Sequence, residues 1–369
     1  MMNNKVQSLY IHIPFCTHLC DYCDFPKLQY FRNFAEKYIE SLIKEIESYK
    51  IKNLKTIYIG GGTPTALDDD LFEKLLSYLT KYIKTVKEYT IEANPESLTN
   101  SKLLIAKKYG VNRISIGVET TNDKILRAIN RQHTFEDVKT AIINARNNGF
   151  DNLNVDLIIG LPHVNKAQLN EDLNNLVTLG IEHISCYSLT VHPNTVFGIK
   201  GIEEPTDSFA RDLYDYAENF LKEKRFIHYE ISNWAKPGRE SLHNLTYWKD
   251  EQYYGVGLGA AGYINGIRYK NTRNLDKYLS GNYVDEKEIV DKKDDRTYFI
   301  MLNLRTIYGI DLAEFKAKFN EDLFLTKHDE IYALVKDKLL VHDRENDRIY
   351  PTYEGMMVLD QIIMQLIEE

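Results

Sequence analysis

Residues 8–23 read SLYIHIPFCTHLCDYC, a short β-strand pattern that runs directly into three closely spaced cysteines. Five more segments rich in β-branched and aromatic residues follow before residue 200, and amphipathic helical stretches separate them. Repeated strand–helix–strand units of this kind predict parallel strands joined by right-handed crossovers. The six predicted strands are residues 8–15, 55–62, 89–96, 112–119, 152–162 and 183–191.

Six such units predict an α/β fold, a partial (β/α)6 barrel similar to a TIM barrel. In the helix that follows the cysteines, Phe34, Tyr38, Leu42 and Ile46 recur at the helical period and form one apolar face. Chemistry in a parallel barrel belongs at the carboxyl ends of the strands. The unusual residue clusters of this chain obey that rule, because each of them follows or ends a predicted strand.

Beyond residue 200 the strand–helix alternation fades. A helix is predicted over 208–224, then an aromatic and glycine-rich region over 229–269, and from about 288 a helical unit with a short hairpin at 339–350. We therefore expect three parts: a core over 1–200, an extension over 201–287, and a C-terminal α+β domain over 288–369.

The composition is that of an ordinary globular protein, with 43% apolar and 27% charged residues and a net charge of −8. Acidic and basic residues are interspersed, so no basic footprint for nucleic acid is present. No apolar run is long enough to span a bilayer, and the first fifteen residues lack the pattern of a signal peptide. We expect a cytoplasmic protein with no nucleic-acid partner.

The spacing of Cys16, Cys20 and Cys23 is C-x3-C-x2-C, in a loop after a strand. Thiolates are the ligands of iron–sulfur clusters, and a complete [4Fe-4S] cubane takes one per iron. Three local cysteines leave one iron open, where the amino and carboxylate groups of S-adenosylmethionine (SAM) can bind. The alternative is a zinc site completed by His18 or His12.

A glycine run, Gly60-Gly-Gly-Thr-Pro64, closes the second predicted strand. Glycine lets the backbone approach a ligand closely, although such a run alone usually marks only a turn. One strand after the cysteine run, it matches the radical SAM pattern in which this segment binds the methionyl end of SAM. The two motifs together favour a radical SAM site over zinc.

Taken in order, LYIHIPFC, the cysteine run, GGGTPT, IEANPE, RISIGVE and VDLIIGLP resemble the oxygen-independent coproporphyrinogen III oxidase family along essentially the whole chain. Two features indicate a branch. The oxidases carry a fourth cysteine two residues after the third and a long N-terminal extension, whereas here Phe25 takes that position and fifteen residues precede Cys16. In addition, residues 243–248 read HNLTYW, which resembles the HNxxYW signature of the HemW-type branch, regarded as haem chaperones.

The resemblance implies a haem-binding protein that delivers haem to an unknown acceptor protein, with peripheral membrane contact only through that acceptor, and without oxidase activity. His243 would ligate haem iron, while a buried histidine anchoring a turn is the alternative. Glu119 stands where the family usually has glutamine. The resemblance places the following residues at or near SAM and the cluster: Tyr10, Tyr22, Gly61, Gly62, Thr63, Glu92, Glu119, Arg131 and Asp156.

Two other functions stay open at this point. One is a true SAM-dependent oxidative decarboxylase of coproporphyrinogen III, and the other is a zinc-binding structural module. Cys186, within an apolar strand, is expected to be a buried and inert thiol rather than a ligand.

Overall fold

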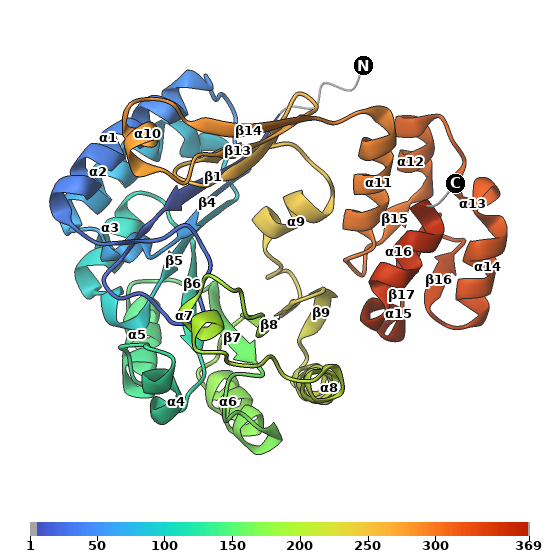
Figure 1. Ribbon diagram of the computed structural model, residues 1–369, viewed down its shortest axis with the longest axis horizontal. Coiled ribbons are helices and arrows are strands. Elements are labelled where there is room, and N and C mark those ends of the chain that lie inside the picture. Colours follow the sequence, from blue (N-terminus) through green and yellow to red (C-terminus); the bar gives the residue numbers. More distant parts are fainter. Residues whose placement is uncertain (1–5, 368–369) are drawn as a thin grey trace.

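The computed structural model describes residues 6–367, and its centre is a strongly curved sheet of twelve strands (Figure 1). Six neighbouring strands in this sheet run parallel, which confirms the predicted barrel-like α/β fold. They are β1 (Ser8–Ile13), β4 (Thr56–Gly61), β5 (Glu88–Ala93), β6 (Arg113–Glu119), β7 (Leu153–Ile159) and β8 (His183–Ser188).

Helices cover the outer face of these strands, and the main hydrophobic core lies between the two layers. Leu42 of the first helix and Ile57 and Ile91 of the sheet belong to this core and are fully buried. The helices are α1 (Arg32–Ser48), α2 (Asp69–Leu79), α3 (Asn100–Lys108), α4 (Asp123–Ala128), α5 (Phe135–Asn147) and α6 (Lys166–Thr178). Thr134 and Asp137 form a reciprocal capping box at the start of α5, which explains why that helix begins there.

The inner face of the same strands is mostly polar. Tyr58 donates to Glu92 across the inside, and Asn154 on β7 donates to Ser115 and lies 2.6 Å from His183. Because successive strand residues point to opposite faces, each strand carries apolar residues toward the helices and polar residues toward the interior. The barrel interior is thus a site for chemistry rather than a second core.

The sheet continues beyond the six expected strands at both edges. β11 (Tyr253–Val256) pairs in parallel with β1, and β12 (Ala261–Ile264), β13 (Ile267–Asn271) and β14 (Val284–Ile289) follow antiparallel. At the other edge β10 (Asn233–Ala235) pairs with β8 and then with β9 (Ile227–Glu230). The sequence reading missed these strands because they are short, rich in tyrosine and glycine, and mostly joined by turns instead of helices. The remaining elements of this part are β2 (Phe15–Cys16), β3 (Leu28–Gln29), α7 (Val196–Ile199), α8 (Asp207–Glu223), α9 (Leu242–Trp248) and α10 (Leu275–Leu279).

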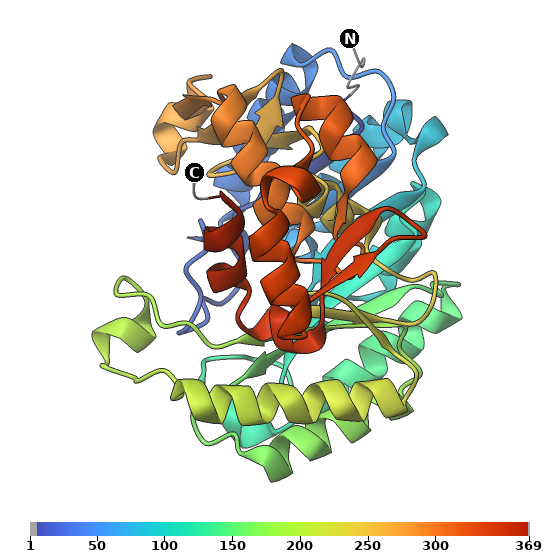
Figure 2. The ribbon, with the colours of Figure 1, turned by 90° about the vertical axis from the view of Figure 1, so that its right-hand side faces the viewer.

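The C-terminal part has a hydrophobic core of its own and stands beside the barrel (Figures 1 and 2). Its small antiparallel sheet has the order β15-β17-β16, and the expected hairpin is formed by the last two strands. Backbone hydrogen bonds, such as the one from Ile231 N to Arg305 O at 3.1 Å, join it to the barrel edge. Its elements are α11 (Lys292–Asn303), β15 (Ile310–Asp311), α12 (Leu312–Phe319), α13 (Leu323–Thr326), α14 (His328–Lys336), β16 (Leu340–Asp343), β17 (Arg348–Pro351), α15 (Tyr353–Met357) and α16 (Leu359–Ile367).

The division into three parts at residues 200 and 287 stays a prediction, and both of its outer limits fall on residues outside the described range, 1–5 and 368–369. Within 6–367, none of the helices has both the length and the apolar character needed to cross a membrane.

Candidate functional site

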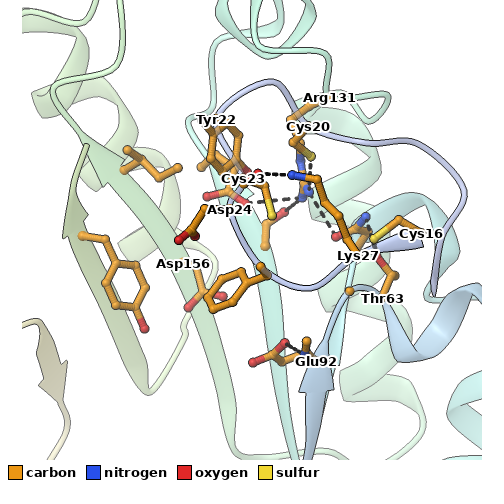
Figure 3. Close-up of a pocket in the computed structure, with 18 of the residues that line it drawn as sticks. Cys16, Cys20, Tyr22, Cys23, Asp24, Lys27, Thr63, Glu92, Arg131 and Asp156 are labelled. Carbon is orange, nitrogen blue, oxygen red and sulfur yellow. Dashed lines mark hydrogen bonds and ion pairs between the residues drawn. The ribbon is translucent and has the colours of Figure 1, made fainter. Parts of the chain in front are cut away.

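A pocket of about 380 Å³ opens at the carboxyl ends of the parallel strands (Figure 3). All three N-terminal cysteines line it, together with the glycine turn and side chains from the ends of four strands. Of the residues that the resemblance singled out, the structure brings the following to this pocket: Cys16, Cys20, Tyr22, Cys23, Gly61, Gly62, Thr63, Glu92, Glu119, Arg131 and Asp156.

The cysteine loop is held in place by hydrogen bonds to its backbone carbonyl groups. Tyr30 N donates to Cys16 O at 2.8 Å, and Asn130 Nδ2 donates to Leu19 O at 2.9 Å. Lys200 forms an ion pair with the buried Asp21 at 2.7 Å, which ties the loop to the segment after β8. The loop is therefore fixed from three directions before any ligand is considered.

The sulfurs of Cys16 and Cys20 accept side-chain hydrogen bonds. Thr63 Oγ1 donates to Cys16 Sγ and Arg131 Nη1 donates to Cys20 Sγ, each at 3.5 Å. Burial raises the pKa of Cys16 to about 11 and also raises that of Cys23. Iron binding must therefore displace thiol protons, and donors to the sulfurs are a known means of tuning a cluster.

The three thiols do not converge on a single point. Within the described residues, no group of three or more histidine, cysteine, aspartate or glutamate side chains is placed to hold one metal ion. His12, one candidate for completing a zinc site, is buried and has both ring nitrogens engaged, at 2.9 Å from Tyr10 Oη and 2.8 Å from Pro26 O. His12 thus joins β1 to the end of the cysteine loop, whereas His18 lines the pocket and is exposed.

The glycine turn is needed for close packing within the protein. A Cβ at Gly60 would lie 2.6 Å from the Glu92 carboxyl carbon, and one at Gly62 would lie 2.8 Å from the Pro14 carbonyl carbon. Gly61 has φ +111°, and a Cβ there would meet the His12 ring at 2.4 Å. The turn therefore fits only glycine, and it presents Gly61 and Gly62 to the pocket.

Glu92 is bound at both carboxylate oxygens. Oε1 accepts from Tyr58 Oη at 2.7 Å, and Oε2 accepts from Gly61 N at 2.9 Å. Desolvation raises its pKa to about 7, although both hydrogen bonds oppose the rise, and the neighbouring charge of Asp156 adds to it. This acid is thus poised between neutral and ionised forms near physiological pH.

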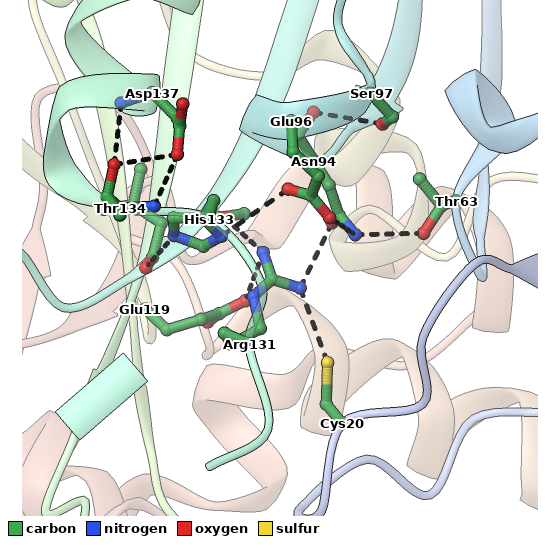
Figure 4. Close-up of polar contacts among 12 residues, drawn as sticks. Cys20, Thr63, Asn94, Glu96, Ser97, Glu119, Arg131, His133, Thr134 and Asp137 are labelled. Carbon is green, nitrogen blue, oxygen red and sulfur yellow. Dashed lines mark hydrogen bonds and ion pairs between the residues drawn. The ribbon is translucent and has the colours of Figure 1, made fainter. Parts of the chain in front are cut away.

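Glu119 and Arg131 form a buried ion pair with an oxygen–nitrogen distance of 3.6 Å (Figure 4). Glu119 has φ +66°, a left-handed conformation at a bulge between β6 and β7, and such strain costs about 1–3 kcal/mol and concentrates at functional sites. Arg131 also donates to Asn94 Oδ1 at 3.1 Å, and its Nε has no partner within the described residues. The Glu119 carboxylate thus pairs with the arginine that donates to Cys20 Sγ.

The remaining predicted SAM contacts lie at different depths. Asp156 accepts from Asn154 Nδ2 at 2.7 Å and faces the pocket from β7, where burial raises its pKa. Tyr22 lines the pocket and packs edge-on against Phe197. Tyr10 does not line the pocket and lies deeper in the interior, 6.1 Å from the Tyr58 ring centroid.

His243 lies at the opposite end of the barrel interior from the cysteines. It sits on α9, is 1% exposed, and both ring nitrogens are engaged, with Thr56 Oγ1 at Nδ1 and Tyr247 Oη at Nε2, each at 2.8 Å. Burial lowers its pKa to about 3, so the imidazole is neutral. In this conformation His243 has the environment of a buried histidine that anchors a turn, and its role as a haem ligand stays a prediction.

Sequence reasoning did not single out several pocket residues. Lys27 donates to Cys23 O. Tyr187, near the end of β8, and Thr190 and His192, which follow that strand, also line the pocket. The rule that chemistry lies at the carboxyl ends of barrel strands could have found them, because they lie at and just beyond the end of the sixth strand. Cys186 is buried and its pKa is raised by desolvation, as expected for an inert thiol.

The chain matches the family model of the radical SAM superfamily over residues 10–176 and the HemN C-terminal domain over residues 290–358. The haem chaperone HemW of Lactococcus lactis is 37% identical, with 96% of this chain and 95% of that protein covered. HemW of Bacillus subtilis is 36% identical, with 99% and 100% covered, and HemW of Escherichia coli is 32% identical, with 88% and 90% covered.

This chain belongs to the HemW family. Its radical SAM domain implies a [4Fe-4S] cluster and SAM, which agrees with the expectation from the cysteine and glycine motifs. Among solved structures, the radical SAM coproporphyrinogen III oxidase HemN of Escherichia coli superimposes with a TM-score of 0.84 at 22% identity, covering 98% of this chain and 90% of that one. That similarity establishes a shared fold. The HemW family assignment therefore rests on the sequence relatives.

Proposed function

We propose that this protein binds haem and transfers it to an acceptor protein, with a [4Fe-4S] cluster held by Cys16, Cys20 and Cys23 and with SAM bound beside it. The observation that carries the proposal is the set of three thiols in one pocket with Phe25, 61% exposed, where the oxidases have a further cysteine. Its HemW relatives carry the name haem chaperone.

The pocket fits such a cluster and SAM in its chemistry. Thr63 and Arg131 donate to two of the sulfurs, and the volume is within the usual range for small-molecule sites, about 300–1,000 Å³. SAM carries a sulfonium charge, and Glu92, Glu119 and Asp156 supply acidic oxygens around the same space. When bound, the cluster supplies one electron, while the residues of the chain hold and orient the ligands.

Haem ligation by His243 requires a change at α9. Iron would have to replace the Tyr247 hydroxyl at Nε2, and the ring would have to become accessible. The neutral state of the imidazole is the one that binds metals, so no proton has to leave. We therefore place haem binding at α9 in a state in which this helix has moved from the barrel.

The test is an absorption spectrum of anaerobically reconstituted protein before and after addition of haem, followed by an assay with coproporphyrinogen III. We expect a cluster band near 400 nm, a Soret band on haem titration, and no conversion of the porphyrinogen. Turnover to protoporphyrinogen IX would restore the oxidase function. Zinc without iron by elemental analysis would favour the structural module.

A further inference from the structure

Tyr58 connects the pocket to the far end of the barrel interior. It lies in the middle of β4, three residues before Gly61 and two after Thr56, and its side chain points inward and is half-buried. Its hydroxyl and its ring contact two different sites that the resemblance had treated as separate.

The hydroxyl contacts the pocket. It donates to Glu92 Oε1 at 2.7 Å, while Oε2 of the same carboxylate accepts from Gly61 N. The Tyr58 hydroxyl is therefore linked to the glycine turn through two hydrogen bonds that share the Glu92 carboxylate. A hydrogen bond to an ionised group is about twice as strong as one between neutral groups, so its strength depends on the charge of Glu92.

The ring contacts α9. It stacks on the His243 ring, with 5.1 Å between centroids and 27° between planes. The first turn of α9 is fixed to the starts of neighbouring strands, because Glu88 accepts from Leu242 N at 2.8 Å and His243 N at 2.9 Å, and Ser8 bonds Thr246 at 2.9 Å. Tyr58 thus links Glu92 of the pocket to His243 of this otherwise locally anchored helix.

We propose that Tyr58 is a positioning residue that couples ligand binding at Glu92 to the burial of His243. The inference rests on the proposed function, since it takes SAM as the ligand near Glu92 and haem as the ligand of His243. It also predicts how SAM regulates haem binding: bound SAM keeps His243 buried in the barrel and thereby weakens haem binding.

The charge of SAM explains why its binding should weaken haem binding rather than strengthen it. A cationic ligand near Glu92 favours the ionised carboxylate, which strengthens the bond from the Tyr58 hydroxyl. A more firmly held ring favours the stacked, buried state of His243, and haem can bind only the released state. By linkage, haem must weaken SAM binding by the same factor.

The experiment compares haem titrations of the cluster-loaded chain with and without saturating SAM, in the native protein and in Tyr58→Phe. The variant keeps the ring and removes only the hydroxyl. We expect SAM to raise the haem dissociation constant of the native protein at least about fivefold, a typical coupling, and to leave it nearly unchanged in the variant.

Tyr229→Phe is the matched control. Tyr229 is fully buried beside the same helix, and its hydroxyl accepts from Ser241 N at 3.2 Å and lies 2.8 Å from His183 Nε2, without reaching Glu92. We expect this control to keep the native effect of SAM. The coupling would be overturned if SAM did not lower the haem affinity of the native protein. It would also be overturned if SAM raised the haem dissociation constant of Tyr58→Phe by the same factor as that of the native protein.

A second measurement needs no haem. In ¹⁵N-histidine-labelled, cluster-loaded protein, the His243 resonance is assigned by its loss in His243→Gln. SAM should shift it in the native chain and not in Tyr58→Phe, and a SAM-bound native chain without a shift would also overturn the coupling. Absence of a Soret band in the first titration would contradict the proposed haem binding and not the role of Tyr58. The His243 resonance would still test whether Tyr58 couples SAM binding to His243.

Discussion

At the scale of single residues, Glu92 is an acidic group of the pocket whose pKa lies near neutral pH. Its pKa is raised from 4.5 to about 7, and desolvation is the largest cause. The folded state therefore binds this proton more tightly than the unfolded state does. A raised carboxyl pKa means that its favourable contribution is complete below about pH 4.5 and is lost as the pH rises toward 7.

Glu92→Gln should therefore make stability less dependent on pH. We expect the native protein to lose about 2 kcal/mol relative to the variant between pH 5 and pH 8, a figure reduced for the solvent that reaches this half-buried group through the pocket. Urea unfolding of the metal-free protein at both pH values measures the difference. Parallel pH dependence of the two proteins would assign the raised pKa to another group.

His243→Ala has two expected effects. Haem affinity should fall at least about tenfold, equivalent to about 1.4 kcal/mol, if iron is ligated there. Stability should also fall by about 2–4 kcal/mol, because a fully buried ring is removed and the Thr56 and Tyr247 hydroxyls lose their partner.

Thr56→Val separates the two effects of His243→Ala. It removes the partner of Nδ1 but keeps the imidazole, so it should lower the midpoint of denaturant unfolding without abolishing the Soret band. Unchanged haem affinity and spectrum in a folded His243→Ala variant would move haem to another residue.

At the scale of elements, the cysteine loop can be tested as a unit. Changing Cys16, Cys20 and Cys23 together to alanine should abolish iron binding and the band near 400 nm, while the fold survives, since the loop is held by backbone contacts and by Asp21 and Lys200. Cys186→Ala is the control and should retain full iron content, because that thiol lies buried in β8 away from the pocket. Iron analysis of both proteins gives the answer.

Helix α9 has seven residues and depends on Glu88 for its first turn. Glu88→Gln removes the charge from two backbone amide contacts, and charged hydrogen bonds contribute about 1.5–3 kcal/mol each. We expect faster amide hydrogen exchange in residues 242–248 with little change in α1. Uniformly faster exchange throughout the chain would instead indicate a global loss of stability.

At the scale of the whole molecule, the C-terminal part is joined to the barrel at its β9 edge. Ile307 N donates to Tyr229 O at 3.1 Å, and Arg211 on α8 bonds Glu354 at 3.0 Å. A chain ending at residue 287 should still bind iron, because all three proposed cysteine ligands lie before residue 24, but it should unfold at lower denaturant concentration. Failure to bind iron would show that the C-terminal part shapes the pocket.

The sequence predicted the barrel because six parallel strands with crossover helices leave a strong periodic pattern, and it predicted the pocket because motifs such as Gly60–Pro64 lie at strand ends. It could not predict the pairing of β11 with β1, because a four-residue strand has no crossover signature. It also could not place His243, since the depth of a short helix within a barrel depends on side chains from distant strands such as Thr56 and Glu88.

In each barrel strand, one face packs against the helices and the other lines the polar interior, and successive residues alternate between the two faces. Substitutions in the polar inner row can change the chemistry, while the apolar row that faces the helices keeps the fold intact. Gaining or losing a single residue within a strand would exchange the two rows beyond that point, except where a bulge such as the one at Glu119 accommodates the extra residue. Barrels of this kind can therefore diverge more easily by substitution at fixed positions than by insertion or deletion of single residues within their strands.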